Sequence, residues 1–294
     1  MATGTSLSST SNLSDGQKIV IAGARMAFEP AAPDPDLVNN SRIGQGEKQW
    51  TVQTYARLSN AGALTEGVDL SQVQQLVTAS TTITPSEHGI IVNLSKRLMR
   101  RQGDANVRTL AGALIGAPLR RVMAADVVTL YDGLSKSIVG ASNALDITSF
   151  RGGVAYLMTD QGASHGPAQP PFHASLHIEQ ISDIILDITD TTPRGTTTGI
   201  SGDLLQRWWK ASDRLYGVQV YHSQIIERDA SGDAKGAIFN PAFAELVMAN
   251  EAEVTDEPDN SLRAVEFGIF QEWGEAEIAD PYGIEVYSDA TATV

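Results

Sequence analysis

Residues 82–133 read TITPSEHGIIVNLSKRLMRRQGDANVRTLAGALIGAPLRRVMAADVVTLYDG, and this stretch decides the fold. Its first part, Ile83 to Gly89, has turn chemistry between β-type runs: Pro85 fixes φ and Gly89 relaxes it, which predicts a β-hairpin. Apolar residues then recur at helical spacing from Val107 to Leu134, which predicts a long helix. No phosphate loop, metal cluster or nucleophile accompanies this sequence, so it indicates an architectural element.

The predicted helix begins near Asp104, a good N-cap residue, and contains Pro118. Proline has no amide hydrogen and clashes with the carbonyl four residues earlier, that of Leu114. We therefore expect either a kink or two abutting helices.

Composition narrows the class of protein. The chain has 294 residues, of which 42% are hydrophobic and 19% charged, as in a globular protein with one large or two ordinary domains. The sequence has no run long enough to cross a bilayer and no signal-peptide pattern at its start. The absence of cysteine excludes disulfides and suits a reducing compartment. A net charge of −14 argues against a nucleic-acid-binding surface, because phosphate neutralisation needs clustered Lys and Arg.

Charge is unevenly distributed along the chain. Seven basic residues and one acid lie between Lys96 and Arg121, whereas twelve acids and one base, Arg263, follow from Glu251 onward. Two solvated faces are the simpler interpretation. The alternative is electrostatic complementarity, within one subunit or between copies, that fixes register.

The first part of the chain reads as an arm followed by a projection. Residues 1–45 contain a helix candidate, Asp15 to Phe28, and then a proline-rich extended path. Three strand candidates follow: Lys48 to Ala56, Gln74 to Thr82 and His88 to Leu94. They predict a two- or three-stranded projection, which needs an external partner because an isolated hairpin is only marginally stable in water.

The central and last parts read as a mixed α/β unit and a β tail. In the central part the elements expected in order are a strand Phe172 to His177 with a helix through Leu186, a short helix capped at Ser201 to Asp203, a strand Tyr216 to Ile226, a return strand Gly236 to Asn240, and a helix Ala242 to Met248. In the tail, Leu262 to Val286, the side chains of Val265, Phe267 and Ile269 share one face.

The sequence offers only weak candidates for a catalytic, metal-binding or ligand-binding site. His173 and His177 have the i,i+4 spacing of two ligands on one helix face, but the local pattern is strand-like, which would place them about 13 Å apart. The acid pairs Asp34/Asp36, Asp187/Asp190 and Glu275/Glu277 could serve a glycosidase in principle, although paired acids are common on the surface of an acidic chain. Trp208 and Trp209 could stack on a base or sugar, but adjacent helical positions point about 100° apart, which favours core or interface.

The order of these elements resembles that of the major capsid proteins of tailed phages, which have the Hong Kong 97-type fold. Ile83 to Ser95 resembles the end of the family's extended loop, and Asp104 to Leu134, with its AADVVTLYDGL ending, resembles the spine helix. Pro171 to Asp183 resembles the strand and helix of the axial domain. The segment Lys235 to Leu246 and the later strands, Arg263 to Asp289, resemble the return to the peripheral domain.

The resemblance implies an α+β fold in five parts: an N-terminal arm (1–45), an extended β-loop (46–92), a peripheral domain with the spine helix (93–140), an axial domain (141–250), and the closing strands of the peripheral domain (251–294). It implies a non-enzymatic subunit, without cofactor or metal, that assembles into hexamers and pentamers around double-stranded DNA. Such a chain would be assembled in the host cytoplasm and reside in the virion.

The partners implied are further copies of the chain, a portal protein, an optional decoration protein, and a separate scaffolding protein, since no charged helical segment precedes the arm. No membrane partner and no covalent Lys–Asn linkage between chains are expected. The candidate contact residues between subunits are Trp50, Tyr55, Arg57, Arg100, Arg101, Trp208, Trp209, Glu272 and Glu275.

Two alternatives stay open. One is a nanocompartment shell of the same fold, similar to an encapsulin, that encloses an enzyme in place of a genome. The other is a soluble hydrolase that uses an Asp/Glu pair, which predicts a small oligomer and the loss of activity on one carboxylate-to-amide change.

Overall fold

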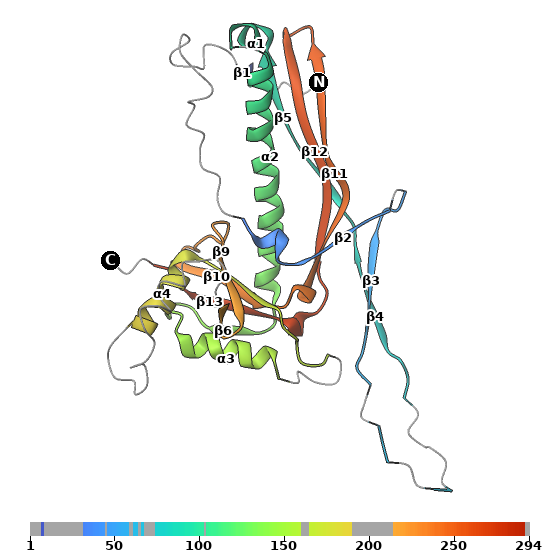
Figure 1. The fold of residues 1–294 in the computed structure, drawn as a ribbon, viewed down its shortest axis with the longest axis vertical. Coiled ribbons are helices and arrows are strands. Elements are labelled where there is room, and N and C mark those ends of the chain that lie inside the picture. The colour runs from blue at the N-terminus through green and yellow to red at the C-terminus, as the bar shows by residue number, and fades with distance from the viewer. Residues whose placement is uncertain are drawn as a thin grey trace.

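The computed structural model describes residues 7–8, 32–44, 46–58, 61–63, 66–67, 74–102, 104–159, 165–189 and 214–291. In this part of the chain the strands form a five-stranded sheet, a six-stranded sheet and a two-stranded ribbon. Figure 1 shows a long helix beside the five-stranded sheet, the six-stranded sheet at the foot of that helix, and the ribbon pointing away from both. The predicted helix Asp15 to Phe28 and the predicted helix with Trp208 and Trp209 lie outside the described residues.

The five-stranded sheet joins segments from both ends of the sequence. Its order is β1 (Leu7–Ser8), β5 (Ser86–Ser95), β12 (Ala264–Glu277), β11 (Ala244–Asp259) and β2 (Asn39–Arg42). The helices α1 (Lys96–Gln102) and α2 (Asp104–Thr129) cover one face. Val265, Phe267 and Ile269 share the buried face, as the alternation in the sequence predicts, and pack in one cluster with Met123 and Val127 of α2.

The helix α2 runs through Pro118 as one element, so the expectation of two abutting helices was wrong (Figure 1). A proline in a helix interior costs about 3 kcal/mol. After the proline, successive turns of the helix are held against the sheet by buried apolar side chains, those of Leu119, Met123 and Val127. The 3-10 turn η4 (Leu130–Gly133) follows directly. No helix in the described ranges is both long and apolar enough to span a membrane.

The predicted hairpin at Ile83 to Gly89 was also wrong. The strand before the turn, β4 (Thr78–Ile83), pairs with β3 (Trp50–Tyr55), whereas β5 after the turn pairs with β12. The chain therefore passes from the ribbon into the body at Thr84 and Pro85. Tight packing fixes this passage, since a Cβ placed on Gly274 of β12 would lie 3.1 Å from Pro85 Cα.

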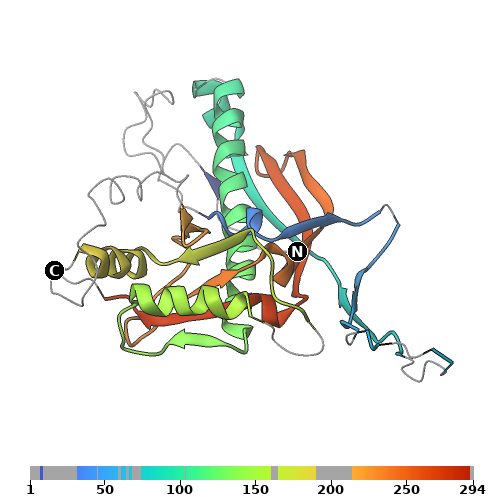
Figure 2. The same cartoon turned by 60° about the horizontal axis from the view of Figure 1, so that its bottom comes forward.

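The six-stranded sheet holds the second core. Its order is β6 (Ser137–Val139), β13 (Gly283–Asp289), β10 (Asp233–Phe239), β7 (Phe172–Leu176), β9 (Val218–His222) and β8 (Arg214–Leu215). Two helices, α3 (Ile147–Leu157) and α4 (Ile178–Thr189), pack their apolar sides into this core. Figure 2 shows both helices beside this sheet. The predicted strand-to-helix segment from Phe172 and the return strand from Gly236 are confirmed.

Two predictions in this region need correction. The helix expected over Ala242 to Met248 is absent: Pro241–Phe243 forms one 3-10 turn, η5, and the chain enters β11 at Ala244. Leu246 and Val247 are both buried, in clusters on opposite sides of the strand, which a strand permits and a surface helix does not. The strand expected from Tyr216 begins at Val218, because Tyr216 and Gly217 form a turn with φ of 52° and 84°.

Candidate functional site

The ribbon of β3 and β4 leads to exposed apolar side chains that lie away from both cores. Trp50 pairs with Ile83 at its base and Tyr55 with Thr78 at its far end. Beyond that point the apolar side chains have no core: Tyr55 is 61% exposed, Leu76 65% and Val77 59%. A two-stranded ribbon that exposes such side chains far from its own body, as in Figure 1, marks an interaction surface.

The base of the ribbon is fixed to its own subunit. Glu245 of β11 is buried, and its Oε1 atom accepts hydrogen bonds from Trp50 Nε1 at 2.9 Å and from the Ser41 hydroxyl. Ile83 packs against Val247 in the same small cluster. Trp50 is therefore half-buried within its own chain, whereas Tyr55 is free to meet another molecule.

The arm is fixed by a second buried carboxylate. Asp34 begins the 3-10 turn η3 (Asp34–Asp36) and is fully buried. Its Oδ1 atom accepts from the Tyr131 hydroxyl at 2.9 Å and from Ser175 Oγ at 2.5 Å, and its Oδ2 atom accepts from Ser223 Oγ at 2.6 Å. The three hydroxyls come from η4, from β7 and from the residue after β9, so one carboxylate joins the arm to both cores.

The hydroxyl of Tyr131 stays protonated in this junction. Burial and the neighbouring Asp34 carboxylate raise the pKa of Tyr131 well above its ordinary value, so it can only donate toward Asp34. Three hydroxyl donors offset part of the cost of burying a carboxylate, which would otherwise be several kcal/mol. The junction therefore specifies one position of the arm.

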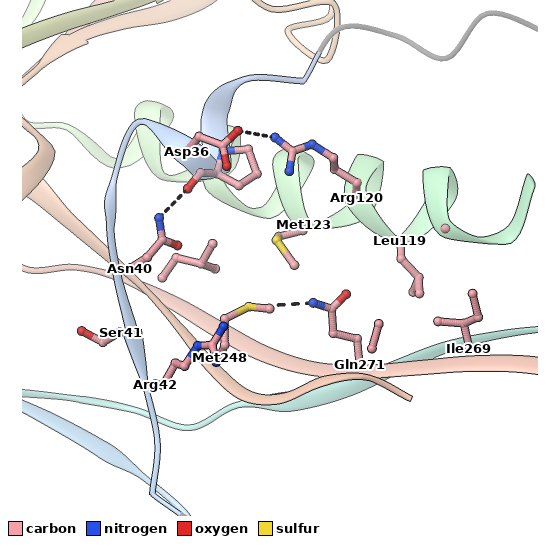
Figure 3. A pocket seen from close by; sticks show the side chains of 14 residues that line it. Asp36, Asn40, Ser41, Arg42, Leu119, Arg120, Met123, Met248, Ile269 and Gln271 are labelled. Carbon is pink, nitrogen blue, oxygen red and sulfur yellow. Dashed lines mark hydrogen bonds and ion pairs between the residues drawn. The ribbon is translucent and has the colours of Figure 1, made fainter. Parts of the chain in front are cut away.

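A groove lies where the arm crosses α2 and the five-stranded sheet. Figure 3 shows apolar side chains on its floor, among them Leu119, Met123 and Ile269, with polar groups around them. Its volume is about 390 Å³. The Asp36 carboxylate on its rim lies 2.5 Å from the Arg120 guanidinium, which also donates to the carbonyl of Ala32. This groove is the place where the arm meets the long helix.

The distal end of the five-stranded sheet carries the basic residues of α1. Arg100 and Arg101 are exposed there, and Arg100 Nε donates to the carbonyl of Lys96 at 3.2 Å. Lys96 Nζ donates to Asn260 Oδ1 in the turn between β11 and β12. The basic segment and part of the acidic segment thus lie at the same end of the subunit.

Glu272, Glu275 and Glu277 are half-buried and lie in the last six residues of β12, at the end of that strand away from α1. Burial and the Asp126 carboxylate raise the pKa of Glu275, and burial and Asp280 raise that of Glu277. Between Glu272 and Glu275 lies Trp273, which is fully buried and donates from Nε1 to Asp126 Oδ2 at 2.9 Å. Of the predicted contact residues, Arg100 and Arg101 in α1 lie at the other end of β12 from Glu272 and Glu275. Trp50 packs in the same small cluster as Ala276, next to Glu275. Arg57 is exposed past the end of β3.

The described residues do not form an obvious catalytic centre. His173 lies in β7 and His177 between β7 and α4, as the strand-like pattern predicts, and no cluster of three metal-ligating side chains occurs among the described residues. Asp34 and Asp36 point to different surroundings, one to the buried junction and one to Arg120. Asp187 accepts a hydrogen bond from the Ile147 amide, and its predicted partner Asp190 lies outside the described residues.

Sequence reasoning missed the junction at Asp34, the carboxylate of Glu245 and the groove. Each depends on side chains brought together from distant segments, and Asp34 looks like an ordinary acid in a proline-rich stretch. The only local signal is that Pro33 and Pro35 restrict the backbone on either side of it.

Comparison with known proteins gives a likeness of structure without a likeness of sequence. No protein-family model and no curated protein matches the chain. A capsid chain of an empty GTA particle matches with a TM-score of 0.68 at 15% identity, over 96% of this chain and 97% of that one. A chain of Mycobacterium phage Che8 matches with a TM-score of 0.65 at 12% identity, over 90% and 93%. A capsid chain of the cyanophage P-SCSP1u matches with a TM-score of 0.65 at 14% identity, over 93% of both chains.

These matches extend over nearly the whole length of both partners, so they reflect the overall architecture and not one common motif. The chain therefore has the mixed α+β fold of the Hong Kong 97-type capsid proteins.

Proposed function

We propose that this chain is a major capsid protein, a structural subunit that assembles with copies of itself into the icosahedral head of a tailed phage and encloses its double-stranded DNA. The observation that carries the proposal is the full-length likeness to capsid chains, in a subunit whose ribbon exposes Tyr55, Leu76 and Val77 away from any core. The protein would then be located in the virion, after assembly in the host cytoplasm.

The proposed division of labour follows the elements. The arm (1–45), apart from its segment 33–43 that is fixed to its own subunit, and the extended β-loop (46–92) would bridge to neighbouring subunits. The peripheral domain (93–140 and 251–294), with α2 as its spine helix, and the axial domain (141–250) would form the body of each hexamer or pentamer. The remaining predicted contact residues, Arg57, Arg100, Arg101, Trp208, Trp209, Glu272 and Glu275, keep this role as part of the proposal.

Assembly of such a shell depends on many modest contacts. Each subunit meets several neighbours, so a closed particle is stable even when a single interface is of ordinary size. The net charge of −14 suits an enclosure that must not adhere to the DNA it holds. A scaffolding protein, a portal protein and a decoration protein would act as separate partners.

A nanocompartment shell is the second candidate, because the same fold would serve it. Purified particles separate the two: enclosed DNA supports the capsid, whereas an enclosed enzyme supports the nanocompartment. A carboxylate hydrolase is disfavoured because, of the described acids proposed for it, Asp36 alone lines the groove.

The decisive experiment is sedimentation with negative-stain imaging of the protein, expressed alone and with its genomic neighbours. Rings of five and six subunits or closed shells are expected. A monomer or dimer under every condition would overturn the proposal.

A further inference from the structure

The outer face of the five-stranded sheet carries a row of hydrogen-bond acceptors. In the strand register Glu257 of β11 lies directly opposite Glu266 of β12, which in turn lies opposite Asn93 of β5. Residues that lie opposite one another in a sheet share a face. Because Val265 and Phe267 point into the core beside α2, Glu266 between them points to the other face.

No described cationic side chain neutralises this acceptor row. Among the described residues no Lys, Arg or His forms an ion pair with Glu257 or Glu266. The Oδ1 atom of Asn93 is buried without a hydrogen-bond partner. Like charges directly opposite on two strands destabilise the pair, and an unpaired buried acceptor adds its own cost. In the described part of the chain the row therefore lacks the cationic donor that its two carboxylates would attract.

Two arginines of α1 lie at the same end of the five-stranded sheet, on its opposite face. Leu98 and Met99 of α1 are buried in the core between the helices and the sheet, which turns Arg97 and Arg101 outward to solvent. These two arginines are four positions apart, so they lie on one face of the helix. Neither forms a hydrogen bond or an ion pair with another described residue. Guanidinium groups supply several donors each and suit carboxylate acceptors.

We infer that Arg97 and Arg101 of one subunit dock onto Glu266 and Glu257 of the next, beside Asn93. The two surfaces lie on opposite faces of one sheet end, so they do not meet within a chain but fit each other between copies. Such a contact is head-to-tail, and a rotation that brings the last copy back to the first closes it into a ring. This inference rests on the proposed function, since it names a contact by which the shell would assemble.

The test is a charge exchange on the full-length protein. Arg97→Glu/Arg101→Glu alone and Glu257→Lys/Glu266→Lys alone should each raise the concentration needed for assembly about tenfold or more, because like charges then face each other. In an equimolar mixture of the two variants, a ring in which they alternate pairs the reversed helix with the reversed row at half of its contacts. The other half pair the wild-type helix with the wild-type row. A chain carrying all four changes pairs them at every contact and should assemble within about threefold of the wild type.

Two controls separate this contact from folding and from net charge. Glu257→Gln/Glu266→Gln removes the charges with little change of shape, and it replaces the lysine variant if that fails to fold as judged by circular dichroism. Glu227→Lys changes an exposed acid elsewhere and should leave assembly unchanged. Raising the salt from about 0.1 M to about 1 M shortens the screening length from about 10 Å to about 3 Å and should weaken wild-type assembly.

The outcomes are distinct. Restored assembly of the fourfold variant supports the contact. If the wild type forms shells and both single-side variants assemble as well as it does, this inference is overturned and the proposed function stands. The row would then be assigned to a cationic partner of a different sequence. Loss of assembly on each side without restoration in the fourfold variant also overturns it. A wild type that never associates overturns both.

Discussion

The arm segment 33–43 and the ribbon 50–83 both lack a core of their own, but they differ in how firmly they are attached to the rest of the subunit. The arm is joined to two cores by the buried carboxylate of Asp34, which three hydroxyl groups contact. The ribbon is fixed at its base by Glu245, and its far end exposes Tyr55, Leu76 and Val77. The difference indicates that the arm segment serves the folding of the subunit, whereas the far end of the ribbon serves contacts with another molecule.

The largest effect on the isolated subunit is expected from Asp34→Ala. It leaves the buried hydroxyls of Tyr131, Ser175 and Ser223 without their acceptor, which should lower the free energy of unfolding by about 3 kcal/mol. Urea titration measures this loss. Asp36→Ala is the matched control, since its exposed ion pair with Arg120 should contribute no more than about 0.5 kcal/mol. Equal effects of the two changes would contradict the assignment of the junction.

A smaller effect is expected from Glu245→Ala. The Trp50 indole and the Ser41 hydroxyl lose their common acceptor, at a cost of about 1–2 kcal/mol. Amide hydrogen exchange should accelerate in β3 and β4 while that of α2 stays unchanged. Faster exchange throughout the chain would mean that the ribbon is not a separate unit.

Asp183 on α4 should have a weaker, pH-dependent effect. Burial and the nearby Asp289 raise the pKa of Asp183 from 3.8 to about 6. The folded state therefore holds a proton that the unfolded chain has lost, so this group lowers stability as the pH rises from about 4 to about 6. Asp183→Asn should raise stability at pH 7, by less than about 1 kcal/mol because the group is partly solvated, and should flatten the pH profile between those values. Thermal unfolding between pH 4 and pH 7 shows whether the slope changes; an unaltered slope would remove Asp183 from this role.

The smallest effect on stability is expected at the far end of the ribbon. Leu76→Asp/Val77→Asp changes two exposed side chains and should shift the free energy of unfolding by less than about 0.5 kcal/mol. Assembly into rings or shells should nevertheless fail, because apolar area that another subunit would bury is lost. Thr78→Asp, an exposed polar position beside them, should assemble more readily than the double variant. Normal particles from the double variant would break the contrast between arm and ribbon.

Regular elements with strong local patterns could be predicted from the sequence. The long helix from Asp104, the strand at Phe172 with its following helix, and the alternation of Val265, Phe267 and Ile269 were all correct, because each depends on neighbours within a few residues. The hairpin at Pro85 failed because the partner of β5 is β12, far along the chain. The helix at Ala242 to Met248 failed because pairing with β12 overrides a good helix start.

The site was less accessible to sequence reasoning than the fold. Tyr55 was correctly placed on an exposed ribbon, whereas Trp50, expected as a contact between subunits, forms its hydrogen bond and its apolar contacts within its own chain. Its role between subunits stays a prediction. Asp34 could not be found at all, since its hydroxyl partners Ser175 and Ser223 are ordinary serines until the chain folds.

The passage at Thr84 and Pro85 gives the subunit a mechanical property. Strand β4 ends at Ile83, β5 begins at Ser86, and α1 follows β5 directly at Lys96, so no slack loop separates the ribbon from the helices. Pro85 rests against Gly274 of the sheet, where a Cβ atom would have almost no room. The ribbon and the helical body are thus connected without a flexible linker, and Pro85 is the fixed point between them. A force applied to the far end of the ribbon is transmitted to β5 and, through β5, to α1.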